Sequence, residues 1–95
     1  MTLKELQTKR DQILKLAQRH GAKDIRSFGS VAQGEESSKS DIDFLIKLEL
    51  GRSLLDLIAF KQDLEELLGT KIDVVTERAL SPYLKDEILK TAVNL

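Results

Sequence analysis

Residues 41–48, with the sequence DIDFLIKL, constrain the fold more than any other part of the chain. They alternate between polar and apolar side chains and then become continuously apolar, which is typical of a buried strand. Asp41 and Asp43 stand two residues apart at its start, so both side chains face the same way. A buried ionised carboxylate is costly unless it is paired or bound to a metal. The segment therefore predicts a strand of a sheet and a functional site built on the two aspartates.

Hydrophobic spacing elsewhere predicts helices that alternate with strands. Ser53 with Asp56 reads as a capping box at one helix start, and Ser81 followed by Pro82 marks another. The expected elements are a helix over 2–20, strands over 24–28 and 41–48, a helix over 53–68, a strand over 71–76 and a helix over 82–94. We therefore predict an α/β domain, and the length of 95 residues is typical of one domain spanning 1–95.

The composition narrows the chemistry. The chain has no cysteine, which excludes disulfides, thiol catalysis and thiolate metal sites, and its one histidine excludes a histidine metal cage. The near balance of 15 basic and 16 acidic side chains argues against direct nucleic-acid binding. No apolar run reaches the ~20 residues of a membrane span and no signal peptide is evident, so we expect a cytoplasmic protein without a membrane partner.

A third carboxylate extends the predicted site. Asp73 stands inside the strand expected over 71–76, although strand interiors disfavour aspartate. Three converging carboxylates would repel one another, and a divalent cation that prefers oxygen ligands, Mg²⁺ or Mn²⁺, would remove that repulsion. The alternative is structural: Asp41 ends a turn, Asp43 pairs with a lysine, and Asp73 sits on a solvated strand edge.

A glycine- and serine-rich stretch precedes the aspartates. Gly29 and Ser30 follow a predicted strand and Gly34 comes four residues later, an arrangement in which backbone amides and a hydroxyl can bind an anion. Ordinary turns use the same residues, so the pair alone indicates little. The combination Gly-Ser, ten residues, Asp, any residue, Asp is expected by chance in roughly one chain of this length in a thousand.

That pattern, G29-S30-x10-D41-x-D43, resembles the signature of the nucleotidyltransferase superfamily related to the palm of DNA polymerase β. The longer string RSFGSVAQGEESSKSDIDFLI is similar to the minimal nucleotidyltransferases, or MNT domains, of bacteria and archaea, and the likeness covers nearly the whole chain. The resemblance implies a nucleotidyltransferase fold of the α/β (α+β) class. It also implies a small mixed sheet of three strands in the order 1-2-3, flanked by helices.

The resemblance also implies roles for the site residues. Asp41 and Asp43 would hold two Mg²⁺ ions, with Mn²⁺ as a substitute, and Asp73 would be the third ligand near the attacking hydroxyl. ATP would be the nucleotide donor.

Gly29, Ser30 and Gly34 would lie in the nucleotide-binding loop, the first two against the outer phosphates. Family members often carry two arginines where this chain has Val31 and Gln33. Arg26 and Lys39 are candidates to replace that positive charge.

Three functions stay open from the sequence. The resemblance implies an antitoxin that binds a helical HEPN ribonuclease toxin and transfers AMP from ATP to a tyrosine of that toxin. The first alternative is a small-molecule nucleotidyltransferase of the antibiotic-modifying type. The second is a catalytically silent antitoxin that acts by binding alone.

Two further features of the sequence have simpler expected roles. His20 precedes a glycine helix stop, where a cation suits the helix dipole. One side of the last helix is apolar, which is explained by core packing or by a partner surface; its residues are Tyr83, Leu84, Ile88, Ala92 and Leu95.

Overall fold

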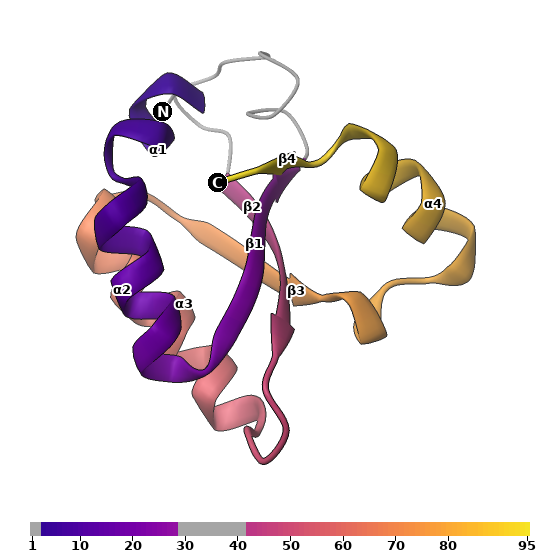
Figure 1. Ribbon diagram of the computed structural model, residues 1–95, viewed down its shortest axis with the longest axis horizontal. Helices are drawn as coiled ribbons and strands as arrows, with labels where there is room; N and C mark the ends of the chain where they lie inside the picture. The colour runs from indigo at the N-terminus through magenta and orange to yellow at the C-terminus, as the bar shows by residue number, and fades with distance from the viewer. Residues whose placement is uncertain (1–2, 29–41) are drawn as a thin grey trace.

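The computed structural model describes residues 3–28 and 42–95 (Figure 1). Along the chain, helical segments come first, two strands follow, and helices and strands then alternate, in the order that the hydrophobic spacing predicts. Its elements are α1 (Leu3–Thr8), α2 (Arg10–His20), β1 (Ala22–Phe28), β2 (Ile42–Leu48), α3 (Leu54–Leu68), β3 (Ile72–Thr76), the 3-10 turn η1 (Glu77–Ala79), α4 (Pro82–Thr91) and β4 (Val93–Asn94).

The strands form one mixed sheet in the order β3-β2-β1-β4. β2 runs antiparallel to β1 and parallel to β3, while β4 runs antiparallel to β1. The mixed sheet and the adjacency of the first three strands are confirmed. The expectation of three strands is wrong, because a fourth short strand is added at the edge of β1.

β4 arises where the last helix ends earlier than predicted. The helix stops at Thr91, and Val93 and Asn94 then pair with Ser27 and Arg26 of β1. Leu95 donates its backbone N–H to the carbonyl of Ile25 at 3.1 Å. The pairing satisfies backbone groups along the edge of β1 that would otherwise face water.

The first predicted helix is divided into α1 and α2 at Lys9. The hydroxyl of Thr8 donates to the backbone carbonyl of Glu5 at 2.6 Å, a local bond of the kind that competes with regular helix geometry. Thr2, which with Glu5 suggests a capping box, lies outside the described residues.

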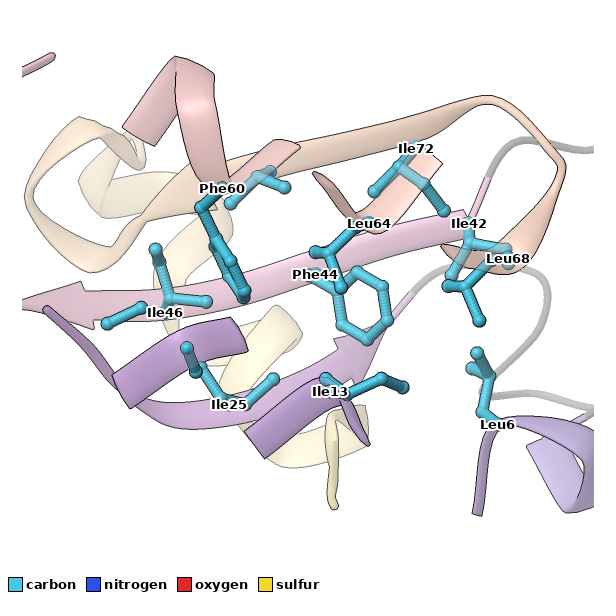
Figure 2. Close-up of a cluster of buried hydrophobic side chains, with 13 residues drawn as sticks. Leu6, Ile13, Ile25, Ile42, Phe44, Ile46, Phe60, Leu64, Leu68 and Ile72 are labelled. Carbon is cyan, nitrogen blue, oxygen red and sulfur yellow. The ribbon is translucent and has the colours of Figure 1, made fainter. Parts of the chain in front are cut away.

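The core lies between the sheet and helices α2 and α3 (Figure 2). Alternate residues of β2 face these helices. The labelled core side chains are Leu6, Ile13, Ile25, Ile42, Phe44, Ile46, Phe60, Leu64, Leu68 and Ile72. Residues 43, 45 and 47 of β2 therefore face the other side of the sheet. Leu45 on that side is also fully buried, which explains the continuously apolar stretch of β2.

Helix α4 stands on the side of the sheet opposite α2 and α3 (Figure 1). None of its residues is buried. Tyr83 is 93% exposed and Leu84 is 52% exposed. Core packing is therefore the wrong explanation for these two apolar side chains, whereas Leu95 of the same predicted apolar side packs against the core.

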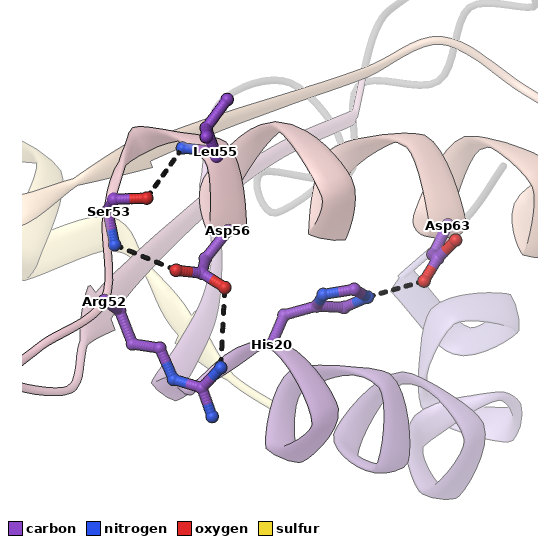
Figure 3. Close-up of polar contacts among 6 residues, drawn as sticks. All are labelled: His20, Arg52, Ser53, Leu55, Asp56 and Asp63. Atoms are coloured by element: carbon purple, nitrogen blue, oxygen red, sulfur yellow. Dashed lines mark hydrogen bonds and ion pairs between the residues drawn. The ribbon is translucent and has the colours of Figure 1, made fainter.

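Helix α3 has the predicted capping box (Figure 3). The hydroxyl of Ser53 accepts the N–H of Leu55 at 3.2 Å, and the carboxylate of Asp56 accepts the N–H of Ser53 at 2.9 Å. The bond from Ser53, together with nearby Arg52, lowers the pKa of Asp56 below its ordinary 3.8. The cap's stabilisation is present above that ordinary pKa and is lost as the pH falls through the lowered value.

A polar contact joins α2 to α3. The Nε2 atom of His20 lies 2.5 Å from Oδ2 of Asp63 (Figure 3). His20 is in the last turn of α2, where a cation was expected to suit the helix dipole. The bond to Asp63 adds a second role, which is to fix the two core helices to each other.

We predict that Ser53→Ala lowers the free energy of unfolding by about 1 kcal/mol, because α3 loses a cap and belongs to the core. Ser81→Ala removes the corresponding cap of α4, where Ser81 accepts the N–H of Tyr83 at 3.3 Å. Since α4 buries no residue, it can open locally and the global free energy should change less. Urea unfolding of both variants checks this; equal losses would show that α4 unfolds together with the core.

Candidate functional site

The site is built on the register of β2 with β3. Asp43 of β2 is directly beside Asp73 of β3 in the parallel ladder. Neighbouring strands lie about 4.8 Å apart, so the two carboxylates can approach the same ion. Both residues belong to the set that faces away from α2 and α3. Asp43 is half-buried and Asp73 is exposed, so this pair borders solvent on the face that the core does not use.

The last residue of β1 also lies beside the aspartate pair. Phe28, the last residue of β1, is paired with Asp43 in the antiparallel ladder. Gly29 and Ser30 follow Phe28 directly in the sequence. These two residues lie outside the described part of the chain, as do Gly34 and Asp41. Of the six predicted site residues, the structure therefore places Asp43 and Asp73, and it brings them together.

The donor chemistry fits a hard divalent cation. Carboxylate oxygens are the ligands preferred by Mg²⁺ and Mn²⁺, and two of them face the same solvent-accessible region. Within residues 3–28 and 42–95, no cluster of three or more histidine, cysteine, aspartate or glutamate side chains could hold a metal. The described pair contains two of the three aspartates that the sequence motif predicts as ligands, and their ligand role stays a prediction.

Arg26, a candidate from the sequence to replace the charge of the two missing arginines, is bound to other side chains. Its Nη1 donates to Oε1 of Glu77 at 2.7 Å, and its Nε donates to Oδ1 of Asn94 at 3.2 Å. It therefore connects β1 to η1 on one side and to β4 on the other. This clamp was not evident from the sequence, because its partners stand 51 and 68 residues further along the chain.

Glu77 also approaches a lysine. Nζ of Lys47 lies 3.7 Å from Oε2 of Glu77 and 3.5 Å from Oδ2 of Asp24. These charges occupy the same face of the sheet as Asp43 but four residues along β2, about 13 Å away at ~3.3 Å per residue.

A hollow of about 460 Å³ lies at that far end of β2 and β3. Its lining includes the basic side chains of Lys23, Lys47, Arg52 and Arg78. Two of these cations are already paired: Lys47 as just described, and Arg52 with Asp56 at 3.4 Å. The hollow is lined by neither aspartate of the Asp43–Asp73 pair, so it is distinct from the predicted reaction site.

Comparison with protein families and curated relatives gives a consistent result. The family model described as "Nucleotidyltransferase domain" matches residues 9–95. A "Putative protein adenylyltransferase" of Methanocaldococcus jannaschii is 42% identical over 95 residues, which are 100% of this chain and 99% of that protein. "Protein adenylyltransferase MntA" of Thermococcus cleftensis is 36% identical over 78 residues, covering 82% of this chain and 79% of the relative.

Solved structures agree with the fold. One described as a "putative minimal nucleotidyltransferase" has a TM-score of 0.90 and 46% identity, covering 100% of this chain and 97% of that chain. A toxin–antitoxin complex with AMP-PNP matches with a TM-score of 0.75 and 24% identity, over 88% of this chain and 69% of the other.

A complex of tri-AMPylated Shewanella oneidensis HEPN toxin with MNT antitoxin matches at a TM-score of 0.69 and 21% identity, over 93% of this chain and 69% of the other. At such identities these two complexes show a shared fold.

In the described part of the chain, no helix is long and apolar enough to cross a membrane.

We predict that Asp43→Asn and Asp73→Asn each reduce nucleotidyl transfer at least about a hundredfold, a loss of some 2.7 kcal/mol of transition-state stabilisation. Each removes one charged oxygen ligand while keeping the side-chain size. Asp73→Asn should leave the melting temperature equal or higher, because like charges beside each other destabilise a sheet.

Asp11→Asn is the matched control, since Asp11 lies on α2 with a 91% exposed side chain. It should transfer nucleotide at the normal rate. Normal transfer by Asp73→Asn, measured with labelled ATP, would remove Asp73 from the site.

Proposed function

Since the chain belongs to the nucleotidyltransferase-domain family, we propose that it transfers AMP from ATP to a tyrosine of a partner HEPN toxin and so acts as the antitoxin. The observation that carries this proposal is the register that sets Asp43 beside Asp73. Both aspartates lie on the face of the sheet opposite α2 and α3, which is called the open face below. Relatives named as protein adenylyltransferases support a protein acceptor, and complexes of the same fold contain toxins, one of them AMPylated.

Three aspartates would hold Mg²⁺ in this proposal. Asp43 and Asp73 fit by position and by donor type, and Asp41 is assigned from the sequence motif. Bound Mg²⁺, or Mn²⁺ in its place, would favour the ionised acceptor hydroxyl and stabilise the negative charge of departing pyrophosphate. The register keeps the carboxylates aligned, because β2 and β3 are fixed by the core on their other face.

Gly29, Ser30 and Gly34 are assigned to the nucleotide from the motif alone. Backbone amides and the serine hydroxyl would bind the outer phosphates of ATP. Val31 and Gln33 add no charge there, and Arg26 is occupied by Glu77 and Asn94. Lys39, the other candidate to replace the charge, lies outside the described residues. With Arg26 occupied, we expect weaker ATP binding than in family members that carry the two arginines. The AMP-PNP complex of a structural neighbour supports ATP as the donor.

The transfer step forms one bond to phosphorus and breaks another. The phenol oxygen of the acceptor forms a bond to the α-phosphorus, and the bond from that phosphorus to the bridging oxygen breaks to release pyrophosphate. The phenol proton must leave, and in this proposal the carboxylate of Asp73, which is exposed, accepts it in addition to its ligand role. We propose a cytoplasmic location for this reaction, because it uses ATP.

The open face favours a folded acceptor. Among the described residues, Asp73 is exposed, and α4 on the same side of the sheet buries none of its own residues. A protruding tyrosine of a partner can reach such a surface without entering a deep pocket. A small molecule would find few enclosing walls there, which makes the antibiotic-type reaction the less favoured alternative.

The test incubates the protein with α-labelled ATP, Mg²⁺ and the protein encoded by the neighbouring gene. We expect label on the neighbour, and loss of that label when the acceptor tyrosine becomes phenylalanine. Asp73→Asn should bind the neighbour in size-exclusion runs but add no label. This pairing separates binding from catalysis.

Two results would contradict the proposal. Tight binding with no label in any condition would indicate an antitoxin that acts by contact alone. Efficient labelling of free aminoglycosides or nucleotides, with no binding to the neighbour, would indicate a small-molecule enzyme.

A further inference from the structure

Tyr83 is the only tyrosine of the chain, and its side chain is 93% exposed. It stands in the first turn of α4, directly after Pro82. The backbone is held in place, since the hydroxyl of Ser81 accepts the N–H of Tyr83. Within the described part of the chain, the side chain of Tyr83 makes no ring contact, and its hydroxyl makes no hydrogen bond. A fixed backbone thus presents an accessible phenol.

The fold gives no reason for this exposure. Tyrosine rings usually bury most of their apolar surface and leave only the hydroxyl near water. The neighbouring Leu84 is also exposed, and α4 buries nothing. The position of Tyr83 therefore contributes little to the core, and its chemistry is available for another purpose.

We propose that Tyr83 is itself an adenylylation site, modified by the carboxylate site of a second copy of this chain. The inference rests on the proposed function, because it needs an enzyme that transfers AMP to a phenol. Tyr83 offers the same nucleophile as the partner's tyrosine. Its oxygen bonds to the α-phosphorus of ATP, the bond to the bridging oxygen breaks, pyrophosphate leaves, and the phenol proton passes to a carboxylate or water.

The topology favours transfer between copies over transfer within one chain. Asp73 is near the start of β3, whereas Tyr83 follows its far end and the turn η1. The three residues from Asp73 to Thr76 alone span about 10 Å, and the chain continues away from the carboxylates before α4 begins.

The segment that carries Tyr83 is also tied down at both ends. Arg26 binds Glu77 before α4 and Asn94 after it, and β4 is paired with β1. Because the segment is held on both sides of α4, we expect that moving Tyr83 to the Asp43–Asp73 pair of its own chain requires a change in these contacts. A second copy can present its α4 without any such change, so the rate should depend on encounters between molecules.

The experiment uses the purified full chain with ATP and Mg²⁺ and no other protein. Intact mass should increase by one adenylyl group, and peptide mapping should place the group on Tyr83. The initial rate per chain should double when the protein concentration doubles. Tyr83→Phe should remain unmodified yet label the neighbouring-gene protein at the normal rate, because Tyr83 is no part of the transfer site.

A mixing experiment tests the route. Tyr83→Phe supplies an active site without the acceptor, and a tagged Asp43→Asn chain supplies the acceptor without activity. We expect label on the tagged chain only when the two variants are mixed. Label at other residues, or a rate per chain independent of concentration, would overturn the inference.

The same labelling experiments distinguish a failure of this inference from a failure of the proposed function. If the neighbouring-gene protein is labelled while Tyr83 stays unmodified, self-modification is wrong and the proposed function stands. If neither acceptor is labelled, both fail.

Discussion

The parallel pairing of β2 with β3 is the constraint on which the candidate site depends. The register that sets Ile42 beside Ile72 and Phe44 beside Val74 in the core also sets Asp43 beside Asp73 on the other face. A slip of one residue would move a carboxylate into the core and an apolar side chain out of it. Core packing thus fixes the register of the two aspartates, and neither can be changed alone.

Much of this could be predicted from the sequence because it depends on local patterns. The apolar stretch after Asp43 predicts a buried strand, and Ser53 with Asp56 predicts the start of α3; both are confirmed. The fourth strand could not be predicted, since two residues give no alternation and β4 forms only because the edge of β1 is nearby. The contacts of Arg26 and the bond from His20 to Asp63 join distant parts of the chain, so spacing gives no signal for them.

The two faces of the sheet differ in what covers them and in the side chains that they carry. One is covered by α2 and α3 and supplies the core, while the other carries the carboxylates and is accompanied by α4. A ten-residue helix is marginally stable alone in water, so its caps and the flanking clamp of Arg26 matter more than packing. An element held at its ends that leaves Tyr83 and Leu84 exposed is suited to contacts with other proteins, including a second copy.

The central claim is that the Asp43–Asp73 pair holds a divalent ion together with the nucleotide. Its most direct test is paramagnetic broadening of backbone amide signals by Mn²⁺ in the presence of a non-hydrolysable ATP analogue. In a titration with Mn²⁺, the signals of Asp43, Asp73 and Phe28 should broaden at the lowest concentration, while those of Lys47 and Thr76, some 10 Å or more along the strands, should require more Mn²⁺ because the effect falls steeply with distance. Broadening centred on Lys47 and Thr76, or unchanged broadening in the Asp43→Asn variant, would contradict the account.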